Sequence, residues 1–432
     1  MAKLAKDSGI PWIGSIPFDW QTVKMKQVAD FQPRCDVSGL SADSEITYTP
    51  MECIRNGYFV NNTALYGDLP PSLTPYNNGD IVFAKVTPCF ENGNIAIMEN
   101  LNSGFGLGSS ELFVVRPRAI GTRFLFYWLQ NDAFIQQGRA TMTGTGGLKR
   151  VSPYFVKNCP LPLPSDKEQQ RIANFLDAEC ARIDAIIEQT RATVEEYKKL
   201  KQSIITQAVT KGIRPNRPMK DSGIEWIGEI PEEWEVKKLK YLASYNDETI
   251  SEATSENFEF DYIDISSVEF GKGIIELQHM KFRDAPSRAR RVVKKDDIIL
   301  STVRTYLKAV ACIKDYCAPL IVSTGFIVLR ALKDKVLPLY LYFAVISESF
   351  ICKVEANSVG ISYPAINAPD VVSFALPVPS LEEQELIAHF LNDKCSFIDS
   401  IIEKKTTFIE ELLNYKKSLI YEYVTGKKEA PL

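Results

Sequence analysis

The sequence predicts an α+β fold with an internal repeat. Two similar mixed domains are joined by two long helices that form an antiparallel coiled coil, and a pseudo-twofold relation links the halves. Two doubled motifs predict this fold. K-D-S-G-I-x-W-I-G-x-I-P-x-x-W begins at Lys6 and again at Lys220, and L-P-[LV]-P-S begins at Leu161 and again at Leu376. Because the offset between copies is nearly constant, the repeat unit is a half-chain and not a short solenoid motif.

The order of predicted elements is the same in both halves. In the first half, short β-type runs at residues 80–84 and 112–115 precede an apolar stretch at residues 124–137, which is typical of a helix packed on a sheet. Residues 297–301, 326–329 and 339–351 occupy the corresponding places in the second half. Between the doubled motifs the halves otherwise share little sequence. We therefore expect one scaffold that is used twice with different contents.

Each L-P-[LV]-P-S motif opens a segment with a heptad pattern. Its prolines exclude a helix up to Ser165 and Ser380, which are suitable N-cap residues. From about residue 166 to about residue 209, apolar residues recur every seven positions on two seams, and the second copy has the same length and phase. A helix of about 44 residues extends about 66 Å, which is too long for one globular domain to cover.

Two arrangements of these helices are open. Each helix packs on its own domain, or the two seams pack on each other, and we favour the second because both copies share length and phase. The Gly- and Pro-containing residues 212–218 end the first helix. A chain ordered domain, helix, domain, helix can then place its helices antiparallel, with the domains at opposite ends. The predicted segments are residues 1–163 for the first domain, 164–213 for a central spacer helix, 214–378 for the second domain and 379–432 for a C-terminal spacer helix.

Composition narrows the class of protein. Of the 432 residues, 45% are hydrophobic and 24% are charged, with a net charge of -4, as in ordinary soluble proteins. No apolar run approaches the roughly 20 residues of a membrane helix. The first residues also lack the apolar core of a secretion signal. The nine cysteines include no C-x-x-C pair, which favours reduced thiols in a cytoplasm over disulfides or a zinc site.

The sequence carries no catalytic signature. It has no G-x-x-x-x-G-K-[ST] phosphate loop, no F-x-G-x-G segment for S-adenosylmethionine, and no spaced acidic cluster typical of a metal-dependent nuclease. It contains only two histidines, His279 and His389, so catalysis by a histidine pair is not expected. The glycine-rich residues 144–147 lack a strand-then-helix context and are interpreted as a mobile loop. We predict no catalytic residue, no metal site and no cofactor in this chain.

Basic residues on expected loops are the positive evidence for recognition. Residues 281–308 contain nine basic residues against three acidic ones. Such side chains suit phosphate contacts, and arginine also reads guanine in the major groove. The acidic net charge argues mildly against nucleic acid, and ordinary surface charge is the alternative for any single residue. The predicted DNA-binding residues are Lys85, Lys149, Arg150, Arg288, Arg290, Arg291, Arg304 and Lys308.

The doubled layout resembles the specificity (S) subunit of type I restriction-modification enzymes. The resemblance is carried by the two K-D-S-G-I openings and by the L-P-[LV]-P-S-x-x-E-Q strips, which end at Gln169 and Gln384. In that family two target-recognition domains alternate with two conserved helical spacers. The resemblance covers essentially the whole chain. It implies a bipartite double-stranded DNA target with two different half-sites.

The same resemblance implies protein partners. An S subunit docks two methyltransferase (M) subunits and works with restriction motor-nuclease (R) subunits, without a membrane. S-adenosylmethionine, ATP and Mg are then expected on the partner subunits, which agrees with the missing motifs. The doubled Trp-Ile-Gly openings offer two similar surfaces for two copies of one partner. The predicted partner-binding residues are Trp12, Ile13, Trp20, Trp226, Ile227 and Trp234.

Two other classes of protein remain as alternatives. One is a self-sufficient DNA methyltransferase-nuclease with a recognition portion of this type, against which the absent cofactor motifs argue. The other is a coiled-coil adaptor without a DNA role, which accounts for the helices but not for two differing domains on one frame. The target bases do not follow from the sequence, because they depend on loop geometry and DNA shape.

Overall fold

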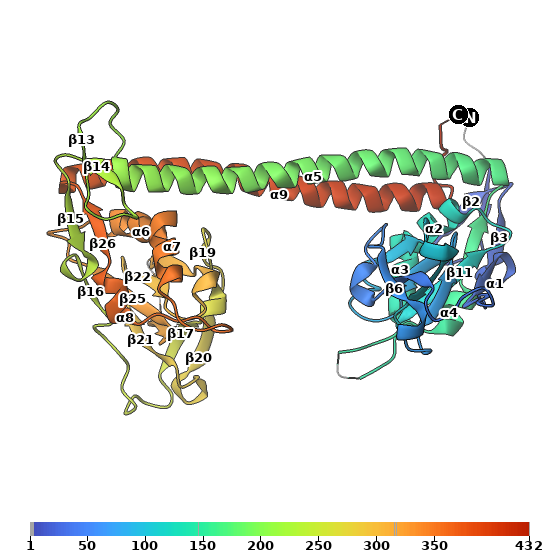
Figure 1. Cartoon of the computed structure of the whole chain (residues 1–432), viewed down its shortest axis with the longest axis horizontal. Coiled ribbons are helices and arrows are strands. Elements are labelled where there is room, and N and C mark those ends of the chain that lie inside the picture. Colours follow the sequence, from blue (N-terminus) through green and yellow to red (C-terminus); the bar gives the residue numbers. More distant parts are fainter. Residues whose placement is uncertain (1–3, 146, 315, 317, 432) are drawn as a thin grey trace. The chain divides into compact units, whose positions relative to one another are not determined.

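The computed structural model describes residues 4–145, 147–314, 316 and 318–431. Contacts divide the chain into two compact units, Met1–Thr190 with Thr407–Leu432, and Arg191–Thr406. The boundaries between the units, after Thr190 and after Thr406, fall inside the two long helices of Figure 1. The division into four consecutive segments is a different description of the same chain, and its boundaries stay a prediction.

Two four-stranded sheets form the first unit. The predicted strands at residues 80–84 and 112–115 are confirmed as β8 (Ile81–Ala84) and β11 (Leu112–Pro117), which pair antiparallel. Their sheet has the order β4 (Ala29–Phe31), β11, β8, β9 (Ile95–Ile97). The other sheet has the order β6 (Asn62–Leu65), β5 (Glu45–Thr49), β10 (Phe105–Gly108), β7 (Thr74–Asn77). Within it, β5 and β10 run parallel.

The second unit repeats this topology. Its predicted strands are confirmed as β22 (Ile298–Ser301) and β25 (Phe326–Ala331), paired antiparallel. One sheet has the order β16 (Ala243–Tyr245), β25, β22, β23 (Val310–Cys312). The other has the order β20 (Gln278–Lys281), β17 (Glu259–Ile263), β24 (Leu320–Ser323), β21 (Ala289–Val293), and β17 and β24 run parallel.

The doubled motifs form small sheets that frame each domain. The Pro-rich strips become strands: β12 (Pro160–Leu163) pairs with β3 (Gln21–Lys24), and β26 (Ala375–Val378) pairs with β15 (Glu235–Lys238). The K-D-S-G-I openings form a second pair in each half. These are β1 (Ala5–Asp7) with β2 (Ser15–Pro17), and β13 (Met219–Asp221) with β14 (Glu229–Pro231). The repeated sequence is thus the part of the fold that closes each domain onto its long helix.

The single helix predicted at residues 124–137 is wrong in one respect, because the chain breaks at Asn131. It forms α2 (Thr122–Gln130) and α3 (Asp132–Ala140), and the buried Asn131 side chain caps α3 by accepting a hydrogen bond from the Phe134 amide at 3.0 Å. The second half breaks in the same way at Ser347, between α6 (Pro338–Ile346) and α7 (Glu348–Ala356). Both break residues have extended ψ angles and precede an acid, which is a typical helix start.

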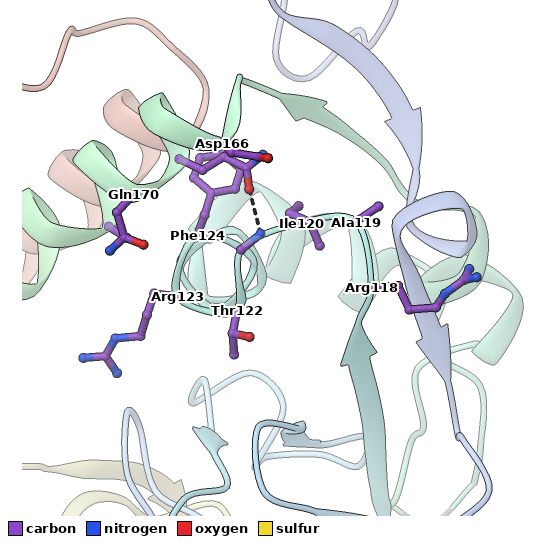
Figure 2. A pocket seen from close by; sticks show the side chains of 11 residues that line it. Arg118, Ala119, Ile120, Thr122, Arg123, Phe124, Asp166 and Gln170 are labelled. Carbon is purple, nitrogen blue, oxygen red and sulfur yellow. Dashed lines mark hydrogen bonds between the residues drawn. The ribbon is translucent and has the colours of Figure 1, made fainter.

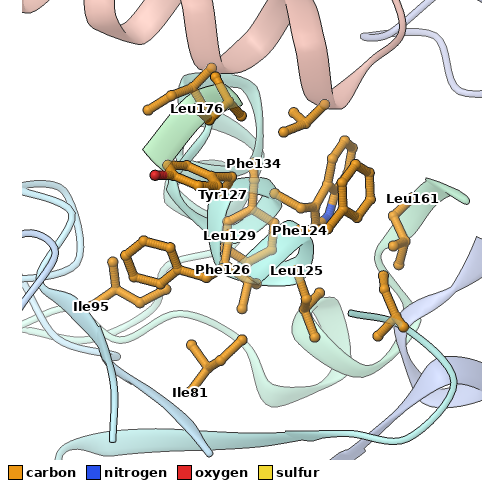
Figure 3. Packing of buried hydrophobic residues seen from close by; sticks show 14 of the residues in the cluster. Ile81, Ile95, Phe124, Leu125, Phe126, Tyr127, Leu129, Phe134, Leu161 and Leu176 are labelled. Atoms are coloured by element: carbon orange, nitrogen blue, oxygen red, sulfur yellow. The ribbon is translucent and has the colours of Figure 1, made fainter. Parts of the chain in front are cut away.

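Helix α2 is apolar on nearly all sides because it lies between the sheet and a long helix (Figure 3). Its residues share one core with Ile81 of the sheet and with Leu176 of α5 (Asp166–Lys211). Helix α6 has the same place in the second unit. There the Tyr340 hydroxyl donates to the carbonyl of Val209 at 3.3 Å or to that of Pro377 at 2.9 Å. A helix without a polar face needs cover on both sides, and the long helices supply the second layer.

The long helices are confirmed as α5 and α9 (Leu381–Val424). Ser380 caps α9 with its side chain, accepting from the Glu383 amide at 3.3 Å, whereas Ser165 uses its backbone carbonyl. Within the first unit the Phe175 and Tyr423 rings lie 4.5 Å apart, and Lys416 Nζ contacts Asp184 at 2.7 Å. Helices α5 and α9 therefore run antiparallel in this unit.

Within the second unit the same antiparallel pairing recurs. Lys201 Nζ contacts Asp399 Oδ2 at 2.6 Å. Lys201 and Lys416 occupy equivalent positions of the two helices, as do Asp184 and Asp399, so the two ion pairs are images of one another under the repeat. The favoured packing of one seam on the other is confirmed inside each unit, and the first turns of each helix pack on their own domain as well.

Gly426, just after α9, allows a close approach that a side chain would block. Its φ is +71°, and a Cβ there would lie 2.3 Å from Pro17 Cδ and 3.1 Å from the Trp20 ring. We expect Gly426→Ala to lower the free energy of unfolding of the first unit by about 2–4 kcal/mol, from backbone strain and overpacking together. Denaturant titration followed by circular dichroism measures this loss.

Gly9 provides the matched control. Its φ is +70°, but nothing lies within 4 Å of a Cβ placed there. Gly9→Ala therefore carries only the backbone cost of about 1–2 kcal/mol. Equal losses for the two variants would show that the close approach of Gly426 to Pro17 contributes nothing to stability.

Candidate nucleic-acid interface

In the first domain the structure brings Lys85, Lys149 and Arg150 together. Lys85 follows β8, and the next residue, Val86, bridges to Arg150. Arg150 also pairs with Thr143, and the Thr87 amide donates to the Lys149 carbonyl at 2.9 Å. Thr143 and Arg150 thus pair on either side of the glycine-rich residues interpreted as a mobile loop, of which Gly146 lies outside the described residues.

Glu111 partly neutralises this cluster. Its carboxylate accepts from Arg150 Nη2 at 2.7 Å, and Lys85 Nζ lies 3.9 Å away. The Arg150 hydrogen bond lowers the pKa of Glu111 below its ordinary value, so the pair is ionised over a wide pH range. Lys149 is exposed and has no ion-pair partner among the residues that the structure describes. Of the three, Lys149 is the cation most available to a phosphate.

In the second domain Arg304 and Lys308 follow β22 and flank a short 3-10 turn. Both have left-handed backbones, with φ of 50° and 52°. The neighbouring Val303 bridges to Ala365, which also pairs with Val359. We call residues 359–365 the 359–365 hairpin. It occupies the position in the second domain that is equivalent to that of the Thr143–Arg150 hairpin in the first.

Lys85 and Arg304 both follow a central strand of their domain, but the backbone hydrogen bonds show that Arg304 lies two residues beyond the position equivalent to Lys85. The Lys85 amide donates to the Glu111 carbonyl at 3.0 Å, and the Val151 amide donates to the Lys85 carbonyl at 2.9 Å. In the second domain Thr302 makes these two bonds, to Gly325 at 2.8 Å and from Ile366 at 2.9 Å. Strand β22 ends at Ser301, so Thr302 takes the place of Lys85.

The three arginines before and within β21 have different surroundings. Arg288 is exposed and contacts Asp264 Oδ2 at 2.7 Å, and Arg290 lies over the Phe282 ring at 5.3 Å. Arg291 turns inward, where its guanidinium donates to Asn246 Oδ1 at 2.6 Å and to the Phe326 carbonyl, and burial lowers its pKa. Arg291 therefore holds segments of its own domain together. Arg288 is connected to the Arg304 region through the turn after β24, where the Thr324 amide donates to the Arg288 carbonyl.

The predicted partner-binding residues line the core of the doubled openings. Trp20 and Trp234 are buried, and their indole nitrogens donate to Glu168 Oε2 at 2.9 Å and Glu383 Oε2 at 3.0 Å. Ile13 and Ile227 are buried as well. Trp12 and Trp226 are half-buried, against Trp128 at 5.6 Å and Phe350 at 6.2 Å. Their role toward a partner stays a prediction, and the two buried indoles present no surface to one.

No role was predicted for the Glu-Gln pair, although it occurs once in each half of the chain. Besides the indole contact of the glutamate, Gln169 Oε1 accepts from the Gly121 amide at 2.7 Å, the dashed bond of Figure 2. Gln384 Oε1 accepts from the Leu337 amide at 2.8 Å in the second unit. The pair thus ties each long helix to the opening Trp and to the start of α2 or α6.

A surface depression of about 500 Å³ lies beside Gln169, between the start of α2 and the start of α5 (Figure 2). Its two arginines have acidic partners: Arg118 contacts Asp30 at 3.1 Å and Arg123 contacts Asp177 at 3.0 Å. Across the described residues, no group of three or more His, Cys, Asp or Glu side chains is placed to hold a metal ion. None of the described helices is both long and apolar enough to cross a membrane.

Comparison with known proteins identifies the class. The profile of the type I restriction modification DNA specificity domain matches residues 17–196 and 231–411, one match in each half. The chain therefore belongs to this family. The predicted resemblance is confirmed.

Individual relatives agree. The chain is 30% identical over 214 residues to the EcoAI specificity subunit of a type I restriction enzyme from Escherichia coli, which covers 47% of this chain and 36% of that protein. It is 26% identical over 409 residues to the putative MjaX specificity subunit from Methanocaldococcus jannaschii, covering 90% and 89%. The chain spans about a third of the length of the first Escherichia coli relatives that it matches, 36% and 32%.

Solved structures share the fold. One such structure concerns the complex assembly and conformational transition of the type I R-M system. A chain from it superposes with a TM-score of 0.72 at 17% identity, covering 96% of this chain and 99% of that one. The HsdS subunit from Thermoanaerobacter tengcongensis superposes with a TM-score of 0.51 at 19% identity, covering 96% and 98%. The predicted fold class, two mixed domains with two long helices, is confirmed.

Proposed function

We propose that this chain is the DNA sequence-recognition subunit of a type I restriction-modification complex. It reads a bipartite double-stranded target with two different half-sites and docks two methyltransferase subunits, and through them restriction subunits. One observation carries the proposal. In each domain a hairpin is held at the end of the equivalent strand, β8 or β22, by equivalent backbone hydrogen bonds. The side chains on the two hairpins nevertheless differ.

The charges near these hairpins support contact with a polyanion. Lys149 in the first domain and Arg304 in the second are exposed, and neither has an ion-pair partner among the described residues. Lys308 and Arg288 lie on segments that adjoin Arg304, although Glu355 and Asp264 contact them. Phosphate contacts position a protein on DNA, and base contacts select the sequence. Both kinds of contact are therefore expected at this end of each domain.

The remaining parts of the proposal follow from the repeated order of domain and long helix. Residues 1–163 and 214–378 are the two target-recognition domains, and residues 164–213 and 379–432 are the spacers. The chain itself is non-catalytic, and S-adenosylmethionine, ATP and Mg belong to the partner subunits. A cytoplasmic location is part of the proposal, supported by the eight described cysteines, all of which are free thiols.

A methylation map of the host genome with and without this gene tests the proposal. We expect loss of the gene to remove methylation from one bipartite motif and from no other motif. Purified chain should transfer no methyl group alone, and methylation should appear when the methyltransferase subunit is added, saturating at two partners per chain. Methyl transfer by the chain alone would favour the self-sufficient enzyme. If the complete complex bound and methylated DNA without regard to sequence, the coiled-coil adaptor without a DNA role would be favoured.

A further inference from the structure

The tip of the 359–365 hairpin exposes apolar side chains that the domain does not use. Ile361 is 103% exposed, Val359 is 81% exposed and Tyr363 is 66% exposed. Apolar groups left in water forgo the stabilisation that their burial against a partner would provide. Exposed apolar clusters of this kind mark interaction sites.

The base of the hairpin is firmly held, in contrast to its tip. Val359 and Ala365 exchange two backbone hydrogen bonds of 2.8 and 3.0 Å, and the Ile366 amide donates to Thr302 at 2.9 Å. Ser358 accepts from the Thr305 hydroxyl at 2.9 Å, which joins the hairpin to the 3-10 turn. The exposed side chains are therefore presented by a fixed backbone and not by a loose loop.

Arg304 belongs to the same surface. Its guanidinium lies over the Tyr363 ring, 5.1 Å from the centroid, and this cation–π contact orients the fork without neutralising its charge. Left-handed backbone at a residue other than glycine is energetically unfavourable and concentrates at functional sites. Here it occurs at both Arg304 and Lys308, on either side of the turn that Thr305 joins to the hairpin.

The first domain supplies the comparison. Its hairpin between Thr143 and Arg150 has the same root, and it carries Leu148, Lys149 and Arg150 where the second carries apolar and aromatic side chains. A cationic surface with a protruding apolar tip fits a DNA groove. Arginine pairs with the O6 and N7 atoms of guanine, and apolar side chains contact the methyl group of thymine.

Resting on the proposed function, we propose that the 359–365 hairpin enters the major groove of the second half-site and reads its bases. Arg304, oriented by Tyr363, contacts guanine, and Ile361 at the tip contacts a thymine methyl group. Val359 completes the apolar tip. The sequence difference between the two hairpins is then a direct source of the difference between the two half-sites.

The test uses the chain in complex with its methyltransferase subunit. The probes are duplexes that carry the motif found by methylation mapping, each with one base changed in one half-site. Tyr363→Ala and Ile361→Ser are each expected to reduce discrimination by about tenfold at one or more positions of the second half-site, and at no position of the first. Ile275→Ser is the matched control, because Ile275 is a 55% exposed isoleucine on another loop of the same domain. It should leave both half-sites unchanged.

Each result is decisive. The exposed positions tolerate substitution, so an unchanged thermal midpoint confirms that the variants are folded. Discrimination that stays at the wild-type level in both variants overturns the inference while leaving the proposed function intact. A uniform loss of binding without a change in discrimination also overturns it, because the hairpin would then only position the domain. Wild-type complex without any base preference would overturn the proposed function and the inference together.

Discussion

Replacing Trp20 with alanine is expected to lower the free energy of unfolding of the first unit by about 3–5 kcal/mol. The side chain is only 1% exposed, and it packs against Phe124 with ring centroids 6.5 Å apart. Its indole nitrogen donates to Glu168, so the variant also leaves a buried carboxylate without that donor. Hydrogen exchange of the α2 and β8 amides, which share this core, measures the loss.

Two further variants separate packing from hydrogen bonding. Trp20→Phe keeps most of the apolar contact and removes the donor, so it should cost about 1–3 kcal/mol. Phe18→Ala, at a 64% exposed position two residues away, should cost less than about 0.5 kcal/mol. If Trp20→Ala left protection unchanged but blocked assembly with the methyltransferase subunit, Trp20 would be a partner contact and its buried position would not describe the protein in solution.

Exchange of the second domain has the largest expected effect on function. Replacing residues 214–378 with the corresponding segment of a relative should change one half of the methylated motif completely and leave the other half intact. Each wrong base pair costs about 1–3 kcal/mol, so several changed positions remove recognition of the old half-site. Sequencing of methylated genomic DNA reads both halves at once.

The structure shows why these junctions are suitable. The pairing of β15 with β26 lies wholly inside the exchanged segment, so the replacement brings its own closing strands. The reciprocal exchange of residues 1–163 is the control, and it should change only the other half-site. A change in both halves after either exchange would contradict independent reading by the two domains.

The strands and long helices were predicted well from the sequence, because their signals are local and occur once in each half of the chain. Strands near Ile81 and Ile298 and both long helices follow from hydrophobic periodicity and from prolines that block a helix. The breaks at Asn131 and Ser347 were missed, because continuous apolar character hid two N-cap residues that were visible in the sequence.

The candidate site was harder to predict because it depends on contacts between distant segments. The 359–365 hairpin adjoins Arg304 through the bridge from Val303 to Ala365 and the contact of Arg304 with the Tyr363 ring, and no local sequence pattern encodes either. Charge alone grouped Arg291 with Arg288, but one side chain is half-buried and the other is exposed. The function of Glu168 likewise depends on a tryptophan far away in the chain.

The two ion pairs between α5 and α9 have a consequence for inheritance. Each helix carries an aspartate and a lysine that complement the inverted copy of the same helix, at Asp184 and Lys416 and at Asp399 and Lys201. All four residues lie outside residues 1–163 and 214–378. Recombination between related genes can therefore replace either of those segments while the contacts that pair the helices are inherited unchanged. Under the proposed function, one such event gives the host a new modification pattern.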